Sequence, residues 1–203
     1  MNTTCKIIGI IGETGSGKST ISRYITSQLD VLHIEGDRVG HIILENNKLK
    51  NSLVLRYGED IIKNEEVDRQ ALGNIVFNKA EELEFLNSLT HPLIKDFIIE
   101  LIKEKQVFYD YILIDGAALI EANILELCHK TIYCYAPKEI RLARLVNSRH
   151  INRAKALKMI NAQPENEFYS SKADFIIDTN KDYKGELINY IRSLNEDDKH
   201  THE

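Results

Sequence analysis

A glycine-rich segment near the beginning of the chain carries residue types that can bind a row of phosphates. It fits the pattern G-x-x-x-x-G-K-[ST] at every fixed position and is followed by a threonine; its residues are Gly12, Glu13, Thr14, Gly15, Ser16, Gly17, Lys18, Ser19 and Thr20. Glycines permit backbone angles that turn successive N–H groups toward an anion. Lys18 can reach the β- and γ-phosphates, and the Ser19 hydroxyl can bind Mg²⁺. The segment therefore predicts a nucleotide-binding loop.

Two acidic residues follow apolar runs and could serve an acceptor hydroxyl. A phosphotransferase must orient that hydroxyl and take its proton, and carboxylates at the carboxyl ends of parallel strands are suited to this. Asp37 is one candidate, although its position also fits a helix N-cap. Asp115 is the other; it could hold Mg²⁺ or its water shell, or simply precede a turn at Gly116. The guanine-reading pattern N-K-x-D is absent, which favours a small-molecule kinase over a switch protein.

Alternating apolar and amphipathic segments supply the elements that would position these residues. Five short apolar runs predict strands at residues 6–11, 31–34, 111–115, 131–135 and 175–178. Helical periodicity is found at residues 18–29, after Pro137, and at residues 153–162 and 185–194. Strands alternating with helices predict an α/β fold with a five-stranded, mostly parallel sheet and helices on both faces. The largely helical stretch 38–107 is too long for a plain crossover and predicts an insertion.

Composition limits the kinds of partner. The 203 residues include 26 Lys and Arg and 31 Asp and Glu, a net charge of −5 that argues against binding to nucleic acid or to an anionic membrane. No apolar run is long enough to span a bilayer, and no signal-peptide pattern precedes the first strand. The three cysteines have no metal-ligand spacing. We expect a cytoplasmic protein, a monomer or weak homo-oligomer, that acts on a small molecule.

An ordered set of motifs gives the chain a resemblance to a known family, covering residues 7 to about 180. Segment 35–41 is similar to D-A-D-x-[IV]-A-[RH], segment 57–58 to F-G, and segment 67–72 to L-[DN]-R-x-x-L. Further along the chain, segment 89–94 is similar to I-x-H-P-x-[IV], and Gln163 with residues 173–174 is similar to Q…A-D. In this order they resemble the dephospho-coenzyme A kinases. The resemblance implies a P-loop kinase fold in a single domain, residues 1–195, with a polar tail at 196–203. Its core would be residues 1–37, 108–136 and 173–195, with an acceptor-binding insertion at 38–107 and a helical lid at 145–172.

The resemblance also implies a reaction. ATP, with Mg²⁺ on Ser19, would phosphorylate the ribose 3′-hydroxyl of dephospho-coenzyme A, and Asp37 would act as base or orienter beside the phosphate-binding Lys18. The acceptor would be bound by Asp37 with three further residues: Arg69, His91 and Asp115. Arg141 and Arg144, on the helix leading to the lid, would neutralise the triphosphate, with Arg144 counted as catalytic. Without the resemblance, His91 before Pro92 would be interpreted as a structural residue where a helix begins.

The lid departs most from the family pattern. Asn166 and Tyr169 stand where positive residues are expected, and the surrounding run is acidic. Lys172 and Arg149 are nearby cations that could compensate. Two alternatives therefore stay open: a kinase of another small hydroxyl acceptor, such as a nucleoside or nucleotide, and a nucleotide-binding relative with weak catalysis.

Overall fold

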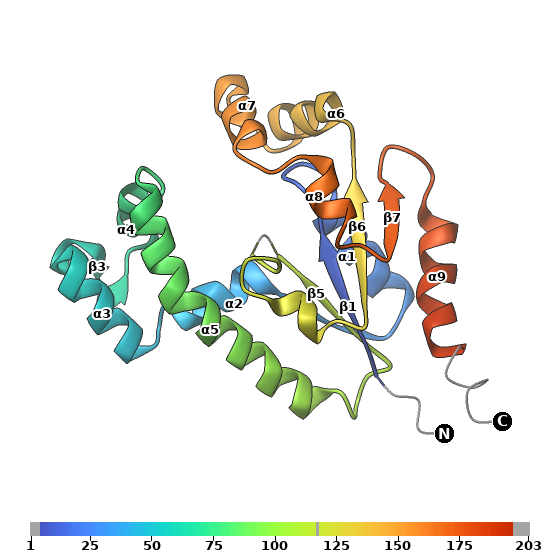
Figure 1. Ribbon diagram of the computed structural model, residues 1–203, viewed down its shortest axis with the longest axis horizontal. Helices are drawn as coiled ribbons and strands as arrows, with labels where there is room; N and C mark the ends of the chain where they lie inside the picture. Colours follow the sequence, from blue (N-terminus) through green and yellow to red (C-terminus); the bar gives the residue numbers. More distant parts are fainter. Residues whose placement is uncertain (1–4, 117, 197–203) are drawn as a thin grey trace.

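A parallel sheet forms the centre of the computed structural model, which describes residues 5–116 and 118–196 (Figure 1). Its strand order is β2 (Val31–Glu35), β5 (Tyr111–Asp115), β1 (Lys6–Ile11), β6 (Lys130–Tyr135) and β7 (Phe175–Asp178), and every pair is parallel. All five predicted strands are present. The predicted tail, from residue 197 onward, lies outside the described residues.

Helices cover both faces of the sheet because its strands are apolar on both sides. Ile8 and Ile10 of β1 pack in one cluster with α1 (Lys18–Gln28) and α9 (Lys184–Glu196). Ile7 and Ile11, which point the other way, pack in a second cluster with α2 (Gly36–Ile43) and α5 (Ala80–Lys105). The alternation follows from the two-residue period of a strand. Helices on both faces of the sheet confirm the predicted fold class.

The segment between β2 and β5 is largely helical and also contains a small hairpin. Its remaining elements are α3 (Asn47–Tyr57), the 3₁₀ turn η1 (Glu59–Ile61), β3 (Ile62–Lys63), β4 (Glu66–Val67) and α4 (Arg69–Val76). Asn64 and Glu65, both with positive φ, form the two-residue turn between β3 and β4. Strands of two residues carry too little periodicity to be found in the sequence.

Pro92 lies inside α5, so the interpretation of His91 as a residue where a helix begins is wrong. A proline inside a helix removes one backbone hydrogen bond. The helix continues because Thr90, Ile94 and Ile98 are buried on one face, and this packing outweighs the local preference.

The lid lies between β6 and β7, above the carboxyl ends of the strands (Figure 1). The helix α6 (Lys138–Ala143) leads to it from β6, and the π-helical turn η3 (Arg144–Ser148), α7 (Arg153–Asn161) and α8 (Asn166–Ser170) follow. Leu145, Ala156 and Ile160 form its own small core. The 3₁₀ turn η2 (Ile124–Leu127) precedes β6, and Ile124 packs in the same cluster as Ile7 and Ile11. Among residues 5–116 and 118–196, no helix is long and apolar enough to cross a membrane.

Candidate active site

The glycine-rich loop turns tightly between β1 and α1. Gly12, Gly15 and Gly17 have φ values of 147°, 77° and 103°, which side chains disfavour. A Cβ on Gly12 would lie 2.5 Å from the carbonyl oxygen of Cys134, and one on Gly15 would lie 2.8 Å from that of Arg141. The neighbouring backbone therefore requires glycine at both positions, and the loop is packed tightly against β6 and α6.

Lys18 folds back onto this loop. Its Nζ donates hydrogen bonds to the carbonyl oxygens of Gly12, at 2.6 Å, and Glu13, at 3.1 Å. Burial lowers the pKa of Lys18, and the charges of nearby groups, Asp37 and Asp115 among them, oppose this only in part. The ammonium group is thus held at the mouth of the loop, while Ser19 next to it is exposed at the start of α1.

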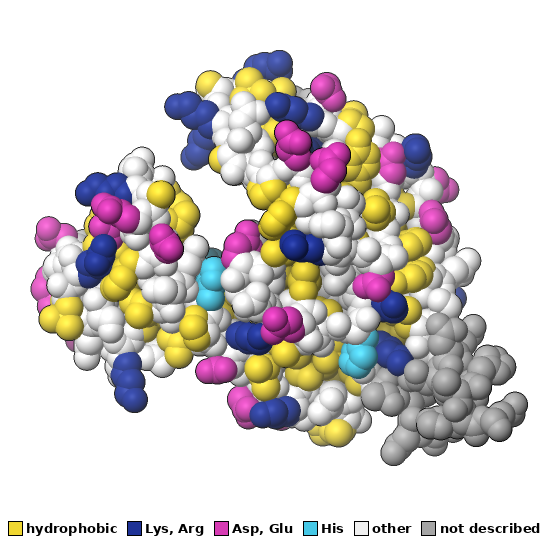
Figure 2. Space-filling model, in the orientation of Figure 1, with side chains coloured by type: hydrophobic (Ala, Val, Ile, Leu, Met, Phe, Trp, Pro, Cys, Tyr) yellow, Lys and Arg dark blue, Asp and Glu magenta, His cyan; other side chains and the backbone are white. Residues whose placement is uncertain are grey.

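A cavity of about 400 Å³ opens above the loop. Five loop residues from Glu13 to Lys18 line it together with Ser19, and across from them lie Asp37, Arg149, Met159 and Gln163. The space-filling view shows an open cleft between the helical insertion and the lid (Figure 2). The cavity therefore brings residues from the loop, from α2 and from the lid to one place.

Asp37 supplies an exposed carboxylate to this cavity. It lies in the first turn of α2 and its side chain is exposed. The N-cap position is occupied by Glu35, whose side chain makes no capping hydrogen bond, so Asp37 is not the N-cap that the sequence allowed. Because α2 begins directly at the carboxyl end of β2, the strand order places this carboxylate near the loop that follows β1.

Asp115 occupies a different environment. It is 9% exposed, does not line the cavity, and accepts a hydrogen bond from Ser22 Oγ at 2.5 Å. His33 Nε2 lies 3.2 Å from the same carboxylate oxygen but is poorly aligned for a hydrogen bond, so we treat this contact as electrostatic. Burial alone raises the pKa of Asp115, but the His33 and Ser22 contacts outweigh it and the pKa lies below its usual value. Asp115 thus links β5 to α1 and β2.

Comparisons with known proteins agree along almost the whole chain. The sequence profile of dephospho-CoA kinase matches residues 6–184. The chain is 33% identical to the dephospho-CoA kinase of Dehalococcoides mccartyi and 35% identical to that of Fusobacterium nucleatum, and both alignments cover 86% of this chain and 89% of the relative. The structure of the dephospho-CoA kinase from Campylobacter jejuni superposes with a TM-score of 0.70 at 26% identity, covering 95% of this chain and 98% of that one. The chain belongs to the dephospho-CoA kinase family. The P-loop kinase fold inferred from the motifs is therefore confirmed.

In this member of the dephospho-CoA kinase family, Arg141 lies behind the loop. Its guanidinium is 3.5 Å from the carboxylate of Glu13, which is fully buried and also accepts a hydrogen bond from the Tyr133 hydroxyl at 3.0 Å. Burial and the Glu13 charge raise the pKa of Tyr133, which keeps the phenol a donor. Arg141 does not line the loop cavity; it lines a second cavity of about 580 Å³ on the lid.

Arg144 also lies behind the loop. Its Nη1 donates to the carbonyl oxygens of Gly15 at 3.3 Å and Ser16 at 3.1 Å, and to Thr179 Oγ1 at 2.8 Å. Its Nη2 donates to the carbonyl oxygen of Thr179 at 2.9 Å. The guanidinium therefore joins the loop to the segment after β7, and it does not line the loop cavity.

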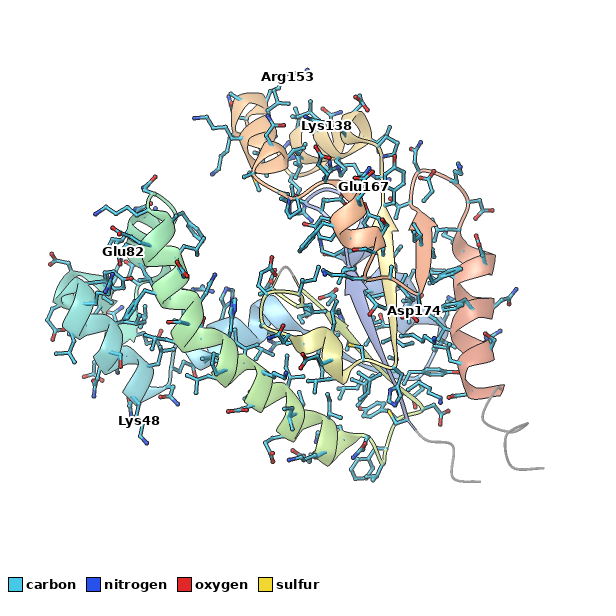
Figure 3. All side chains as sticks on the ribbon, in the orientation of Figure 1. Lys48, Glu82, Lys138, Arg153, Glu167 and Asp174 are labelled. Carbon is cyan, nitrogen blue, oxygen red and sulfur yellow. The ribbon has the colours of Figure 1, made fainter. Side chains whose placement is uncertain are left out.

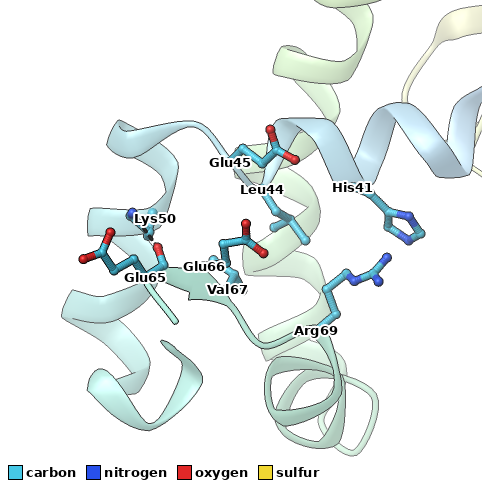
Figure 4. Close-up of a pocket in the computed structure, with 8 residues that line it drawn as sticks. All are labelled: His41, Leu44, Glu45, Lys50, Glu65, Glu66, Val67 and Arg69. Atoms are coloured by element: carbon cyan, nitrogen blue, oxygen red, sulfur yellow. Dashed lines mark hydrogen bonds between the residues drawn. The ribbon is translucent and has the colours of Figure 1, made fainter. Parts of the chain in front are cut away.

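The acceptor-side residues are divided between two places. Arg69 and His41 line a cavity of about 370 Å³ between the β3–β4 hairpin and the end of α2 (Figure 4). His91 lies midway along α5, half-buried, and lines neither this cavity nor the loop cavity. The sequence indicates His41 only as the last residue of the motif at 35–41, and the cavity places it with Arg69.

The divergent lid positions are engaged in packing. Tyr169 stacks on Tyr133 with ring centres 5.7 Å apart, and Asn166 Oδ1 lies 3.4 Å from the Tyr133 hydroxyl. Gln163 Oε1 accepts a hydrogen bond of 2.7 Å from the backbone N–H of Thr14, a contact between lid and loop that the sequence did not indicate. Thr14 and Gln163 are 149 residues apart, so no local sequence pattern could have predicted this hydrogen bond.

Proposed function

We propose that this protein transfers the γ-phosphate of ATP to the ribose 3′-hydroxyl of dephospho-CoA, giving CoA and ADP. One observation supports the proposal beyond the family membership: Lys18, Ser19 and Asp37 line a single cavity. A phosphate-binding cation, a hydroxyl that can hold a metal ion and an acceptor-side carboxylate are the groups that in-line phosphoryl transfer requires.

Each loop residue has a role in this proposal. The backbone N–H groups of residues 12–19 and the beginning of α1 surround the phosphates. Lys18 exchanges its contacts with the carbonyl oxygens of Gly12 and Glu13 for contacts with the β- and γ-phosphates. The exposed Ser19 hydroxyl offers an oxygen donor of the kind Mg²⁺ prefers. Mg²⁺, when bound, would neutralise charge between the β- and γ-phosphates.

Asp37 acts on the acceptor. As the new bond forms between the 3′-oxygen and the γ-phosphorus, the bond from phosphorus to the ADP oxygen breaks, and the hydroxyl proton passes to the Asp37 carboxylate. The helical insertion 38–107 binds the acceptor in this proposal, with the side chains of Arg69 and His41 facing its diphosphate, and the lid 145–172 covers ATP. His91 would support this domain from α5, and Asp115 would hold β5 and α1 in place beneath the acceptor.

The net charge of −5 disfavours binding to nucleic acid. We propose that the protein acts in the cytoplasm as a monomer or weak homo-oligomer, on a small molecule and not on nucleic acid.

The test measures ADP release by the purified full-length chain with ATP and Mg²⁺. We expect dephospho-CoA to stimulate release and nucleosides or nucleotides not to do so. The variant Asp37→Asn should lower kcat by about 10²–10⁴-fold, with a smaller effect on the KM for ATP, because it removes the proton acceptor. Asp30→Asn, an exposed carboxylate before β2 and outside the cavity, is the matched control. Stimulation by a nucleoside instead of dephospho-CoA, or unchanged turnover of Asp37→Asn, would contradict the respective assignment.

A further inference from the structure

Enzymes that transfer phosphoryl groups commonly neutralise the charge of that group with an arginine in addition to the loop lysine. Of the two arginines expected in this role, Arg141 faces the buried Glu13 carboxylate, and Arg144 donates to acceptors in the loop and in the segment after β7. Lys172 lies with its Nζ 4.9 Å from the centre of the Phe168 ring, outside the loop cavity. The cations that line the loop cavity, within residues 5–116 and 118–196, are Lys18 and Arg149.

Arg149 differs from Arg141 and Arg144 in its surroundings. It is exposed, and its guanidinium has no hydrogen-bond or ion-pair partner among the described residues. It shares the cavity with Asp37 and with the loop residues from Glu13 to Ser19. Arg153, only four residues later, does not line this cavity and lies at the outer end of the lid (Figure 3).

The backbone before Arg149 explains why its side chain reaches the loop. Residues Arg144–Ser148 form a π-helical turn, and the Arg149 N–H donates to the carbonyl oxygen of Arg144 at 3.3 Å, five residues earlier. The wider turn changes the direction of the side chains that follow it, and such turns are frequent at functional sites. The chain then reverses at His150, whose φ of 54° is a costly backbone conformation for a residue other than glycine.

The same turn keeps the lid core intact. Leu145 stays buried against Ala156 and Ile160, and its carbonyl oxygen accepts a hydrogen bond of 3.0 Å from the Ile151 N–H. In a regular α-helix with Leu145 buried in the same way, the residue at position 149 would point in a different direction. The π-turn therefore aims Arg149 at the loop without disturbing the packing that fixes the lid.

We infer that Arg149 is a catalytic residue of this chain: its guanidinium contacts the γ-phosphate of ATP and stabilises the charge on that group as it transfers. This rests on the proposed phosphoryl transfer from ATP. A guanidinium is suited to the task because its N–H groups match two phosphate oxygens at once. The π-turn places in the lid the positive charge that Asn166 and Tyr169 do not carry.

The first measurement is turnover. Arg149→Ala should lower kcat with dephospho-CoA by about 100-fold or more, in line with the loss of a charge-stabilising group in phosphoryl transfer. Arg149→Lys should recover part of this loss, since it keeps the charge but not the paired N–H groups. Arg153→Ala removes the same charge from the same lid and should leave kcat within twofold of the wild type. All three variants should unfold at the wild-type temperature, because neither exposed side chain is part of the lid core.

The second measurement does not depend on the acceptor. The affinities for Mg²⁺-ADP and for a non-hydrolysable ATP analogue, measured by calorimetry, give the binding contributed by the γ-phosphate. Arg149→Ala should reduce this ratio of affinities at least fivefold while changing the affinity for ADP less than twofold. A ratio equal to that of Arg153→Ala would overturn the inference, as would an unchanged kcat. If the wild-type protein does not phosphorylate dephospho-CoA, the proposed function fails, and the affinity ratio alone decides the role of Arg149.

Discussion

Replacement of Arg144 by alanine should destabilise the protein before any ligand is bound. The Nη1 atom has two protons and three acceptors within 3.3 Å, so at most two of its bonds form fully, and Nη2 adds a third. Hydrogen bonds from a charged group contribute about 1.5–3 kcal/mol each, but their sum is not additive. The Ser16 carbonyl keeps a donor in Thr179 Oγ1 at 2.6 Å, which reduces the loss. We expect a cost of about 3 kcal/mol in the free energy of unfolding.

For a chain of this size, 3 kcal/mol corresponds to a decrease in Tm of about 6–12 °C. Circular dichroism of the nucleotide-free protein measures it directly. Arg144→Lys should fall between alanine and the wild type, because an ammonium group reaches fewer of these acceptors, and Arg153→Ala should not change Tm. If the Tm of Arg144→Ala stays within about 2 °C of the wild type while kcat collapses, Arg144 serves the triphosphate and the reasoning above is wrong.

Two further substitutions test the loop and the sheet. Gly12→Ala places a Cβ 2.5 Å from the Cys134 carbonyl oxygen. This variant should lose the rise in Tm that Mg²⁺-ATP gives the wild type. The control Gly185→Ala, whose Cβ would meet no neighbouring atom within 4 Å, should keep that rise. Asp174 accepts hydrogen bonds from the Thr131 N–H at 2.8 Å and from Lys130 Nζ at 3.0 Å. Burial raises the pKa of Asp174, but these bonds outweigh it and the pKa lies below its ordinary value of 3.8. A carboxyl with a lowered folded-state pKa stabilises the fold above that ordinary value and loses the effect as the pH falls through the folded-state pKa. Because the pair with Lys130 is exposed to solvent, Asp174→Asn should unfold more easily by only about 0.5–1 kcal/mol at pH 7, and its urea denaturation curve should approach that of the wild type well below pH 3.8. A difference that does not change with pH would contradict the charge-based explanation.

The sequence by itself determined the sheet and the phosphate loop. Strands buried on both faces are continuous apolar runs, and helices flanking them have a clear 3.6-residue period, so local pattern was enough to place all five strands of the sheet. The loop is also local: its glycines, Lys18 and Ser19 lie within eight residues of one another. The motifs spread along the chain were sufficient to recognise the family, because their order survives at about one-third identity.

Only the tertiary structure decided which charged residues face the loop. Arg141, Arg144 and Arg149 lie within nine residues of each other in sequence, and nothing local distinguishes them. The first faces Glu13, the second bonds to the segment after β7, and the third lines the cavity. The direction of a side chain depends on backbone geometry such as the π-turn, and on partners more than 100 residues away, such as Glu13 for Arg141. Contacts of that kind exist only after the chain has folded, so the sequence showed the available charges but not their positions.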